Sequence, residues 1–284
     1  MNLSKINPPN WSYSEMSAKL KKFVKIYRER PIKKNFHGMR FNHMFALYFI
    51  LLKIKPKVVI ESGIFKGQST WLIKKTLPKC KIFSFDIDLK NRIFISKKVR
   101  YFEYDLKYYN FNNFPKETLV FLDDHQNHLE RLKLLKWIGF KHVVLEDNYP
   151  VGRGDFYTLR HAFSKKGFNH HLSFLNIIKT SALLLLEFFK KKINKNYFIK
   201  LLKINSRLRD AFPNSMDIDY LKKNIEIYYE FPPVAKLKKN KWGDSLENKS
   251  FRTEKSIYKY TPKFLKEFEN EIKIYNYLTY LKLK

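Results

Sequence analysis

Cysteine is almost absent from this 284-residue sequence, and so are the signals that would direct a chain to a membrane. One cysteine, Cys80, excludes an internal disulfide framework and a cysteine-based zinc cluster, and it predicts a reducing, cytoplasmic setting. The first residues lack the basic region and apolar run of a secretory signal. The most apolar stretch, residues 174–189, is interrupted by Lys179 and Glu187, whereas a membrane span needs about 20 mainly apolar residues. We therefore expect no transmembrane span.

Acidic residues are also scarce, because 26 aspartates and glutamates face 57 lysines and arginines, for a net charge of +31. Such a balance can indicate a nucleic-acid or other polyanionic partner. Here, however, the excess is mostly lysine, spread along the chain among many Asn, Ile, Phe and Tyr, as is typical of an A/T-rich genome. There is no RGG tract, no Cys/His finger and no long basic tail. A nucleic-acid partner stays open but is not favoured.

The chain is organised around residues 57–70, KVVIESGIFKGQST. A short apolar run predicts a buried strand, Glu61 stands at its end, and a loop with Gly63 and Gly67 leads through Ser69 into a helical pattern. In open α/β sheets such a loop lies at the crevice where small molecules bind, and glycine lets a ligand approach the backbone closely. The alternative is a tight turn that needs glycine for its geometry alone. The spacing E-x-G-x-x-x-G-x-S differs from the dinucleotide pattern G-x-G-x-x-G.

Short apolar strands alternate with helical patterns through the first 150 residues. Further strands are expected at about 81–85, 99–104, 118–122 and 141–145, and two more near 224–231 and 275–284. This alternation predicts an α/β fold, a Rossmann-like doubly wound sheet that is mostly parallel with an antiparallel last strand. We expect residues 1–36 to form an N-terminal helical cap. Residues 37–284 would form the main domain, with a helical insertion at about 170–212.

Acidic residues follow the end of each of the first five predicted strands. Because carboxyl ends of parallel strands meet at one edge of a sheet, this pattern predicts a polar site there. Asp86 could accept hydrogen bonds from the ribose hydroxyls of an adenosine, and Asp105 from an adenine amine. The glycine loop leaves room for the amino-acid part of S-adenosylmethionine. Either aspartate could instead serve as a helix N-cap, and Asp88 competes with Asp86 for the ribose role.

A second acidic group follows the fourth and fifth strands, as Asp123-Asp124-His125 and Glu146-Asp147. Four carboxylates close together need a cation to offset their repulsion, and hard oxygen ligands suit Mg²⁺ or another divalent ion. His125, with an ordinary pKa of about 6.5, could take a proton from a substrate hydroxyl. Helix capping by Asp124 and surface ion pairs for the others are the alternative.

The order of these motifs, an E-x-G loop, FDID, DDH and LEDNY, resembles the class I S-adenosylmethionine-dependent methyltransferases over about residues 40–150. Within that class it is similar to the metal-dependent cephalosporin hydroxylase/rhamnosyl and macrolide-sugar O-methyltransferases. The resemblance implies a cofactor site at Glu61, Gly63, Gly67, Ser69, Asp86 and Asp105. It also implies metal ligands among Asp123, Asp124, Glu146 and Asp147, with His125 as the base. The chain departs from the family in lacking G-x-G-x-G and in reading DDH, which leaves the ligand register open between the two aspartates.

These observations predict an enzyme that transfers a methyl group from S-adenosylmethionine, with a divalent cation, to a hydroxyl of a sugar, glycan or related small molecule. One alternative is an RNA or other nucleic-acid methyltransferase. The D/N-P-P-Y/F motif of amino-methylating enzymes is replaced here by DDHQ. The other alternative is a non-catalytic cofactor-binding subunit, whose carboxylates would be dispersed in space. Homo-oligomerisation stays open.

Overall fold

A computed structural model describes residues 8–150, 153–164, 215–240, 243, 255–275 and 277–284. The helical insertion predicted at about 170–212 and the apolar stretch at 174–189 lie outside these residues. No helix within the described ranges is long and apolar enough to cross a membrane.

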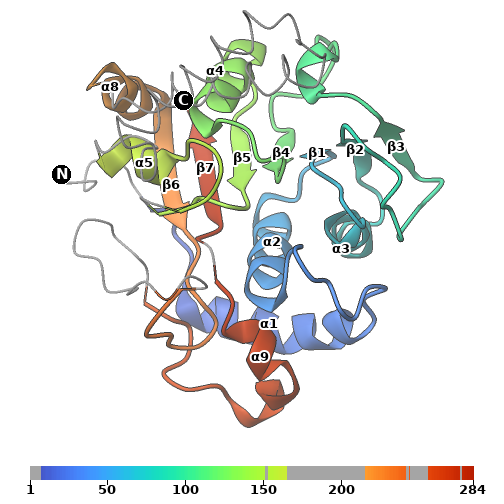
Figure 1. Cartoon of the computed structure of the whole chain (residues 1–284), viewed down its shortest axis with the longest axis vertical. Helices are drawn as coiled ribbons and strands as arrows, with labels where there is room; N and C mark the ends of the chain where they lie inside the picture. The colour runs from blue at the N-terminus through green and yellow to red at the C-terminus, as the bar shows by residue number, and fades with distance from the viewer. Residues whose placement is uncertain (1–7, 151–152, 165–214, 241–242, 244–254, 276) are drawn as a thin grey trace, which may run out of the picture.

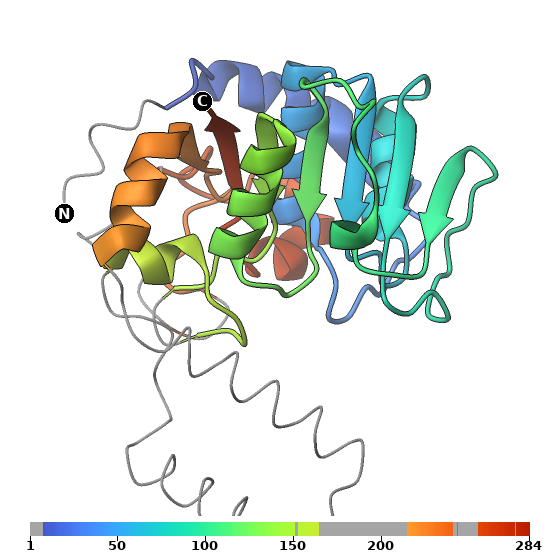
Figure 2. The same ribbon diagram turned by 90° about the horizontal axis from the view of Figure 1, so that it is seen from above.

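The centre of the fold is a seven-stranded sheet with the order β3-β2-β1-β4-β5-β7-β6. The first five strands run parallel, and β7 is antiparallel to both of its neighbours. Figure 2 shows the arrowheads of the blue-to-green strands at one edge and the dark red β7 pointing the opposite way. The strands are β1 (Val58–Ser62), β2 (Lys81–Phe85), β3 (Val99–Phe102), β4 (Leu119–Leu122), β5 (His142–Leu145), β6 (Ile225–Glu230) and β7 (Thr279–Leu283). The predicted mostly parallel sheet with an antiparallel last strand is confirmed.

Helices cover both faces of the sheet, as Figure 1 shows. One face carries α1 (Tyr13–Arg28), α2 (Phe41–Ile54), α3 (Gln68–Thr76), η3 (Lys263–Phe268) and α9 (Glu269–Ile272). The other carries η2 (Leu106–Tyr108), α4 (His128–Ile138), α5 (Leu159–Ser164) and α8 (Ser215–Asn224). Because side chains alternate across a strand, Val59 packs into the first layer while Val58 and Ile60 pack into the second. Two hydrophobic cores therefore enclose the sheet.

The N-terminal helix belongs to the first of these cores. Ser12 caps α1 by accepting a hydrogen bond from the Glu15 amide, and Phe23 and Tyr27 of this helix are buried against Phe41 of α2. The predicted boundary after residue 36 thus separates two segments whose side chains share one core.

Local capping signals decide where α4 begins and ends. The apolar residues at three-residue spacing predict a helix from Gln126 to Ile138. The side chain of Asn127 accepts hydrogen bonds from the amides of Leu129 and Glu130, so the helix starts at His128, two residues later. Gly139 ends it with a φ of +94°. This places the Asp123–Gln126 segment in a loop at the carboxyl edge of the sheet.

Candidate cofactor and metal site

The sheet reverses its strand order between β1 and β4, and the glycine loop lies at this point. From β1 the chain proceeds outward to β3 and then returns to place β4 on the other side of β1. Loops after the carboxyl ends of two such strands diverge and leave a crevice between them. The loop that joins β1 to α3 therefore stands where ligands bind in open α/β sheets.

Gly63 is required by the close approach of β4. Its φ is +88°, and a Cβ built there would lie 2.0 Å from the carbonyl oxygen of Asp123. Gly67 has a φ of +83° at the start of α3, and a Cβ there would lie 2.8 Å from the carbonyl oxygen of Phe94. Both glycines are thus needed for the geometry of the turn, which is the alternative given in the sequence analysis. Because they have no side chains, they also leave space beside the loop backbone.

Asp86 holds the glycine loop in place from the end of β2. Its Oδ2 accepts hydrogen bonds from the amides of Ile64 at 2.7 Å and Phe65 at 3.1 Å, and its Oδ1 accepts from the amide of Asp88 at 3.2 Å. Each carboxylate oxygen has two acceptor sites, so this carboxylate retains capacity for further donors. Asp86, rather than Asp88, is the acid that lines the adjoining cavity.

Glu61 is fully buried in the sheet beneath the loop. One of its oxygens accepts from Thr70 Oγ1 at 2.7 Å and from Ser84 Oγ at 2.6 Å. Burial raises its pKa, against the lowering effect of hydrogen bonds from Ser69, Ser84 and Thr70. These contacts tie β1, β2 and the first turn of α3 together, so Glu61 and Ser69 support the loop from below.

Asp105 and Asp124 share one arginine, Arg131 of α4. The guanidinium donates to both oxygens of Asp105, at 2.8 and 3.0 Å, and to Asp124 at 2.8 Å. Asp105 also caps η2 by accepting from the Lys107 amide, and Asp124 accepts from Ser62 Oγ at 2.7 Å. Burial opposes the ionisation of Asp105, but the hydrogen bonds from Arg131 and the Lys107 amide hold its pKa below the ordinary value. One guanidinium thus offsets one of these two negative charges, and burial still raises the pKa of Asp124 above its ordinary value, against the lowering effect of Arg131 and of the hydrogen bond from Ser62.

Asp123 faces the other way, toward Glu146 and Asp147 at the end of β5. Its carboxylate makes no hydrogen bond or ion pair with any residue that the structure describes. Burial raises its pKa well above the ordinary value, and the charges of Glu146, Asp147, Asp124 and Glu61 raise it further. Of the two aspartates that the sequence left open, Asp123 is thus the one with an uncompensated charge.

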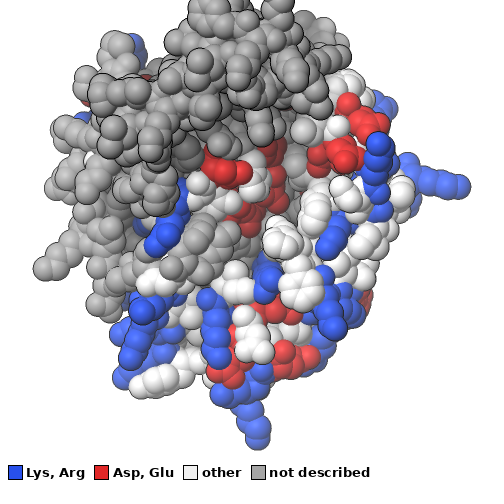
Figure 3. Space-filling view, in the orientation of Figure 1, with Lys and Arg blue, Asp and Glu red and all other residues white. Residues whose placement is uncertain are grey.

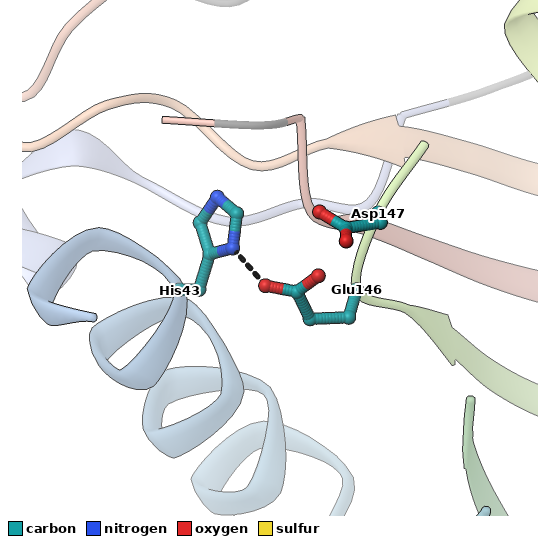
Figure 4. Close-up of side chains that lie close together, drawn as sticks. All are labelled: His43, Glu146 and Asp147. Carbon is teal, nitrogen blue, oxygen red and sulfur yellow. Dashed lines mark hydrogen bonds and ion pairs between the residues drawn. The ribbon is translucent and has the colours of Figure 1, made fainter. Parts of the chain in front are cut away.

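His43 of α2 completes this acidic group. Figure 4 shows it reaching from the helix to hydrogen-bond Glu146 through Nδ1, with Asp147 beside them. All three side chains are buried, and they offer ligand atoms within 4.8 Å of one another. Asp123, His125 and Asp147 form a second such set that shares Asp147. Two overlapping donor sets of this kind fit a divalent cation.

His125 lies at the rim of the acidic group in a left-handed conformation, with a φ of +53°. Its Nδ1 lies 3.1 Å from Asp155 Oδ2, and its Nε2 lies 3.8 Å from Asp147 Oδ2. The hydrogen bond to Asp155 raises the pKa of His125 to about 9, despite the lowering effect of burial. The pKa of His125 in this arrangement thus lies above the ordinary value of about 6.5 from which the sequence-based prediction started, and the protonated imidazole is favoured near neutral pH.

Two cavities meet at Asp123. One, of about 380 Å³, is lined by Gly63, Phe65, Asp86, Ile87, Tyr104 and Asp105, among others. The second, of about 520 Å³, is lined by Arg40, His43, Glu146, Asp147, Asn240 and Lys273, among others. His37, Gly38 and Asp123 line both. Figure 3 shows acidic side chains gathered in a hollow near the middle of this face, with lysines and arginines spread around it.

A larger cavity, of about 820 Å³, opens at the other edge of the sheet, beside the starts of β1 and β2. No carboxylate or histidine is among its described lining residues, so it offers no chemistry of the kind found at the carboxyl edge.

The structure divides the residues singled out in the sequence into three groups. Gly63, Asp86, Asp105, Asp124 and His125 line the smaller cavity, Glu146 and Asp147 line the larger of the two that meet, and Asp123 lines both. Glu61 and Ser69 lie behind the loop, Gly67 ends the loop at the start of α3, and Asp124 pairs with Arg131. His43 was missed, although a histidine within the otherwise apolar run FNHMFALYFILL was a signal. Arg40 and Arg131 had no comparable signal among so many basic residues.

Comparison with family models finds no match, and comparison with curated proteins finds none either. Among solved structures the chain is similar to a CmcI apo-structure, with a TM-score of 0.33 and 14% identity over 50% of this chain and 67% of that one. It is also similar to the SAH-bound methyltransferase PaMTH1 of Podospora anserina, with a TM-score of 0.32 and 14% identity over 50% and 72%. A third is the O-methyltransferase TomG of Streptomyces achromogenes in complex with SAM, with a TM-score of 0.34 and 16% identity over 45% and 64%. Likeness at this level carries no functional argument, which must come from the residues themselves.

Proposed function

We propose that the protein is an S-adenosylmethionine-dependent O-methyltransferase, assisted by a divalent cation, that acts on a hydroxyl of a sugar, glycan or related small molecule. The observation that carries the proposal is the position of Asp123. It lies on the wall shared by a cavity beside the glycine loop and a cavity that holds the acidic group. Two substrates bound on either side of this residue would meet there, which is what group transfer requires.

The smaller cavity has the chemistry of an adenosine site. Phe65, Ile87 and Tyr104 supply apolar surface for a base, and the last two are exposed at 80% and 39%. Asp86 stands among them with acceptor capacity for ribose hydroxyls. S-adenosylmethionine, when bound, supplies an electrophilic methyl group on a sulfonium. The predicted adenine contact of Asp105 has to compete with Arg131, so we assign it a weaker part.

The acidic group has the composition of a magnesium site. Asp123, Glu146 and Asp147 supply hard oxygen donors, and His43 hydrogen-bonds Glu146 and holds its orientation. A divalent cation, when bound, offsets the mutual repulsion of these carboxylates and orients the acceptor hydroxyl. Asp124 is not assigned to this set, because Arg131 and Ser62 already satisfy it.

His125 remains the proposed base. Its imidazole must first lose its own proton to solvent before it can accept one from the acceptor hydroxyl. Asp155 and the acidic group hold that proton at the rim of the site. A divalent cation bound by Asp147 and Glu146 would offset their charges and so remove part of the cause of the raised pKa of His125. The hydrogen bond between His125 and Asp155 would remain. We therefore expect the histidine to act as a base above neutral pH.

The alternatives predicted different surroundings for these residues. A non-catalytic subunit would have dispersed carboxylates, whereas here two overlapping sets, joined at Asp147, each bring two carboxylates and one histidine within 4.8 Å of one another. The lysines and arginines around the hollow in Figure 3 leave a nucleic-acid acceptor open, whereas the acidic side chains at its centre favour a cation over a phosphate backbone at that point.

The test is a calorimetric titration of S-adenosylmethionine into the protein, with and without Mg²⁺. Asp86→Asn keeps an acceptor for the loop amides but loses charge toward the ribose, so binding should weaken at least tenfold. Asp88→Asn, two residues away and outside the cavity, is the matched control and should bind as the unaltered protein does. No binding to the unaltered protein in either condition would end the methyltransferase proposal.

The cation site is tested separately with Mn²⁺, whose free signal is measured by electron paramagnetic resonance. Asp123→Asn should abolish tight binding, and Asp124→Asn should leave it nearly unchanged. Equal losses in both variants would show that the ligand register is not the one proposed.

A further inference from the structure

The larger of the two meeting cavities contains charges of both signs that do not pair with each other. Asp123, Glu146 and Asp147 lie in its wall together with Arg40 and Lys273. Glu146 and Asp147 are buried, whereas Arg40 is half-buried and Lys273 is mostly exposed. No ion pair joins these five side chains to one another.

Arg40 differs from three other arginines with little exposed surface. Arg30, Arg131 and Arg160 each pair with at least one carboxylate. Arg40, which is half-buried at the start of α2, makes no side-chain hydrogen bond or ion pair with the residues that the structure describes. Its guanidinium carbon lies 5.5 Å from the centre of the Phe36 ring. No described carboxylate therefore competes with a ligand in the cavity for the five donors of Arg40.

Lys273 stands in the same wall as a second positive charge. Its ammonium lies 3.7 Å from Glu269, and its side chain is 61% exposed, so the pair is weak. Arg40 and Lys273 together offset the charge of two carboxylates. The five side chains then carry a net charge of −1, and a divalent cation at the acidic end would change it to +1. A ligand with one negative charge would neutralise the cavity.

From this arrangement we infer that the acceptor is an anion: a hydroxylated, sugar-sized molecule with a carboxylate or a phosphate that Arg40 binds. The inference rests on the proposed function, because the acceptor hydroxyl is taken to lie at the acidic end. Arginine presents a planar fork that matches both anionic groups, and Lys273 adds charge without fixed geometry. A cavity of about 520 Å³ holds one sugar ring with a charged substituent.

The test uses three probes that differ at one position: methyl glucoside, the methyl glycoside of glucuronate, and methyl glucoside 6-phosphate. Binding is measured in Mg²⁺ by saturation-transfer NMR. At least one anionic probe should bind tenfold or more tightly than the neutral one, and which of the two it is distinguishes carboxylate from phosphate. Arg40→Gln should remove that preference, so that in this variant the anionic probes bind no more tightly than the neutral one. Arg100→Gln, an exposed arginine on β3, is the matched control.

Equal binding of all three probes, no binding of either anion, or an unchanged preference in Arg40→Gln would overturn the inference. Arg40→Lys, which retains the charge, should keep part of the preference and guards against a folding defect in the glutamine variant. S-adenosylmethionine is titrated into the same samples. Intact cofactor binding without an anion preference refutes this inference alone, whereas lost cofactor binding in the unaltered protein refutes the proposed function.

Discussion

Replacing Gly63 by alanine tests the close approach of the residues that follow β1 and its parallel neighbour β4, which form the floor of the site. The added Cβ would lie 2.0 Å from the Asp123 carbonyl oxygen, so the two backbones must separate by about 1.4 Å to reach the ordinary contact distance of 3.4 Å. Such a shift strains the hydrogen bond from the Asp123 amide to the Ser62 carbonyl, which is 2.7 Å long. The left-handed φ costs about 1 kcal/mol and the displaced strand end about 2 kcal/mol or more.

Gly139→Ala is the matched control, because Gly139 has a φ of +94° and no heavy atom within 4 Å of the added Cβ. It should lose about 1 kcal/mol of unfolding free energy, for the backbone conformation alone. Urea denaturation followed by circular dichroism gives both values. If Gly63→Ala loses no more stability than Gly139→Ala, the close approach of the two strands does not exist in solution. If Gly63→Ala loses the expected unfolding free energy of about 3 kcal/mol, its affinity for the cofactor should fall as well, because Asp123 moves with the end of β4.

Three other perturbations have expected outcomes. Glu230→Gln breaks a pair with Arg160 in which both side chains are 1% exposed, so urea denaturation should show a loss of about 3–5 kcal/mol, and a loss below 1 kcal/mol would contradict the buried pairing. Burial lowers the pKa of His128 to about 3, so the unfolded chain takes up its proton first and stability falls as the pH drops from about 6.5 toward 3. Between pH 7 and pH 5 the unaltered protein should lose about 2 kcal/mol more than His128→Leu, and equal losses would argue against a buried neutral imidazole. Asp155→Asn should lower the pKa of His125 from about 9 toward 6.5 in an NMR titration, and an unchanged value would assign the shift to other charges.

Most of the fold could be predicted from local patterns. The apolar run VVI and its counterparts mark strands because each is short and bounded by turn residues, and Gly139 and Pro78 mark the ends of helices. The start of α4 was misplaced by two residues, because the capping by Asn127 depends on how the preceding loop leaves β4.

The site could be predicted as a location but not as a set of contacts. Acids at five strand ends indicate one polar edge, and that edge is where the cavities lie. The sequence could not tell that Asp124 would pair with Arg131 while its neighbour Asp123 would not, because successive residues at the end of a strand point to opposite faces. Nor could it show that Asp155 would raise the pKa of His125.

The amino-acid sequence by itself determined the alternation of strands and helices, the parallel sheet and the edge on which its acids gather. These follow from periodicity and chain direction, which are local properties. The tertiary structure decided which carboxylates are neutralised and which are not, and it brought His43 and Arg40 from the start of α2 to the end of β5. The charge state of a side chain depends on its neighbours in space, and residues that are about 100 positions apart meet there only after the sheet and its helices have packed.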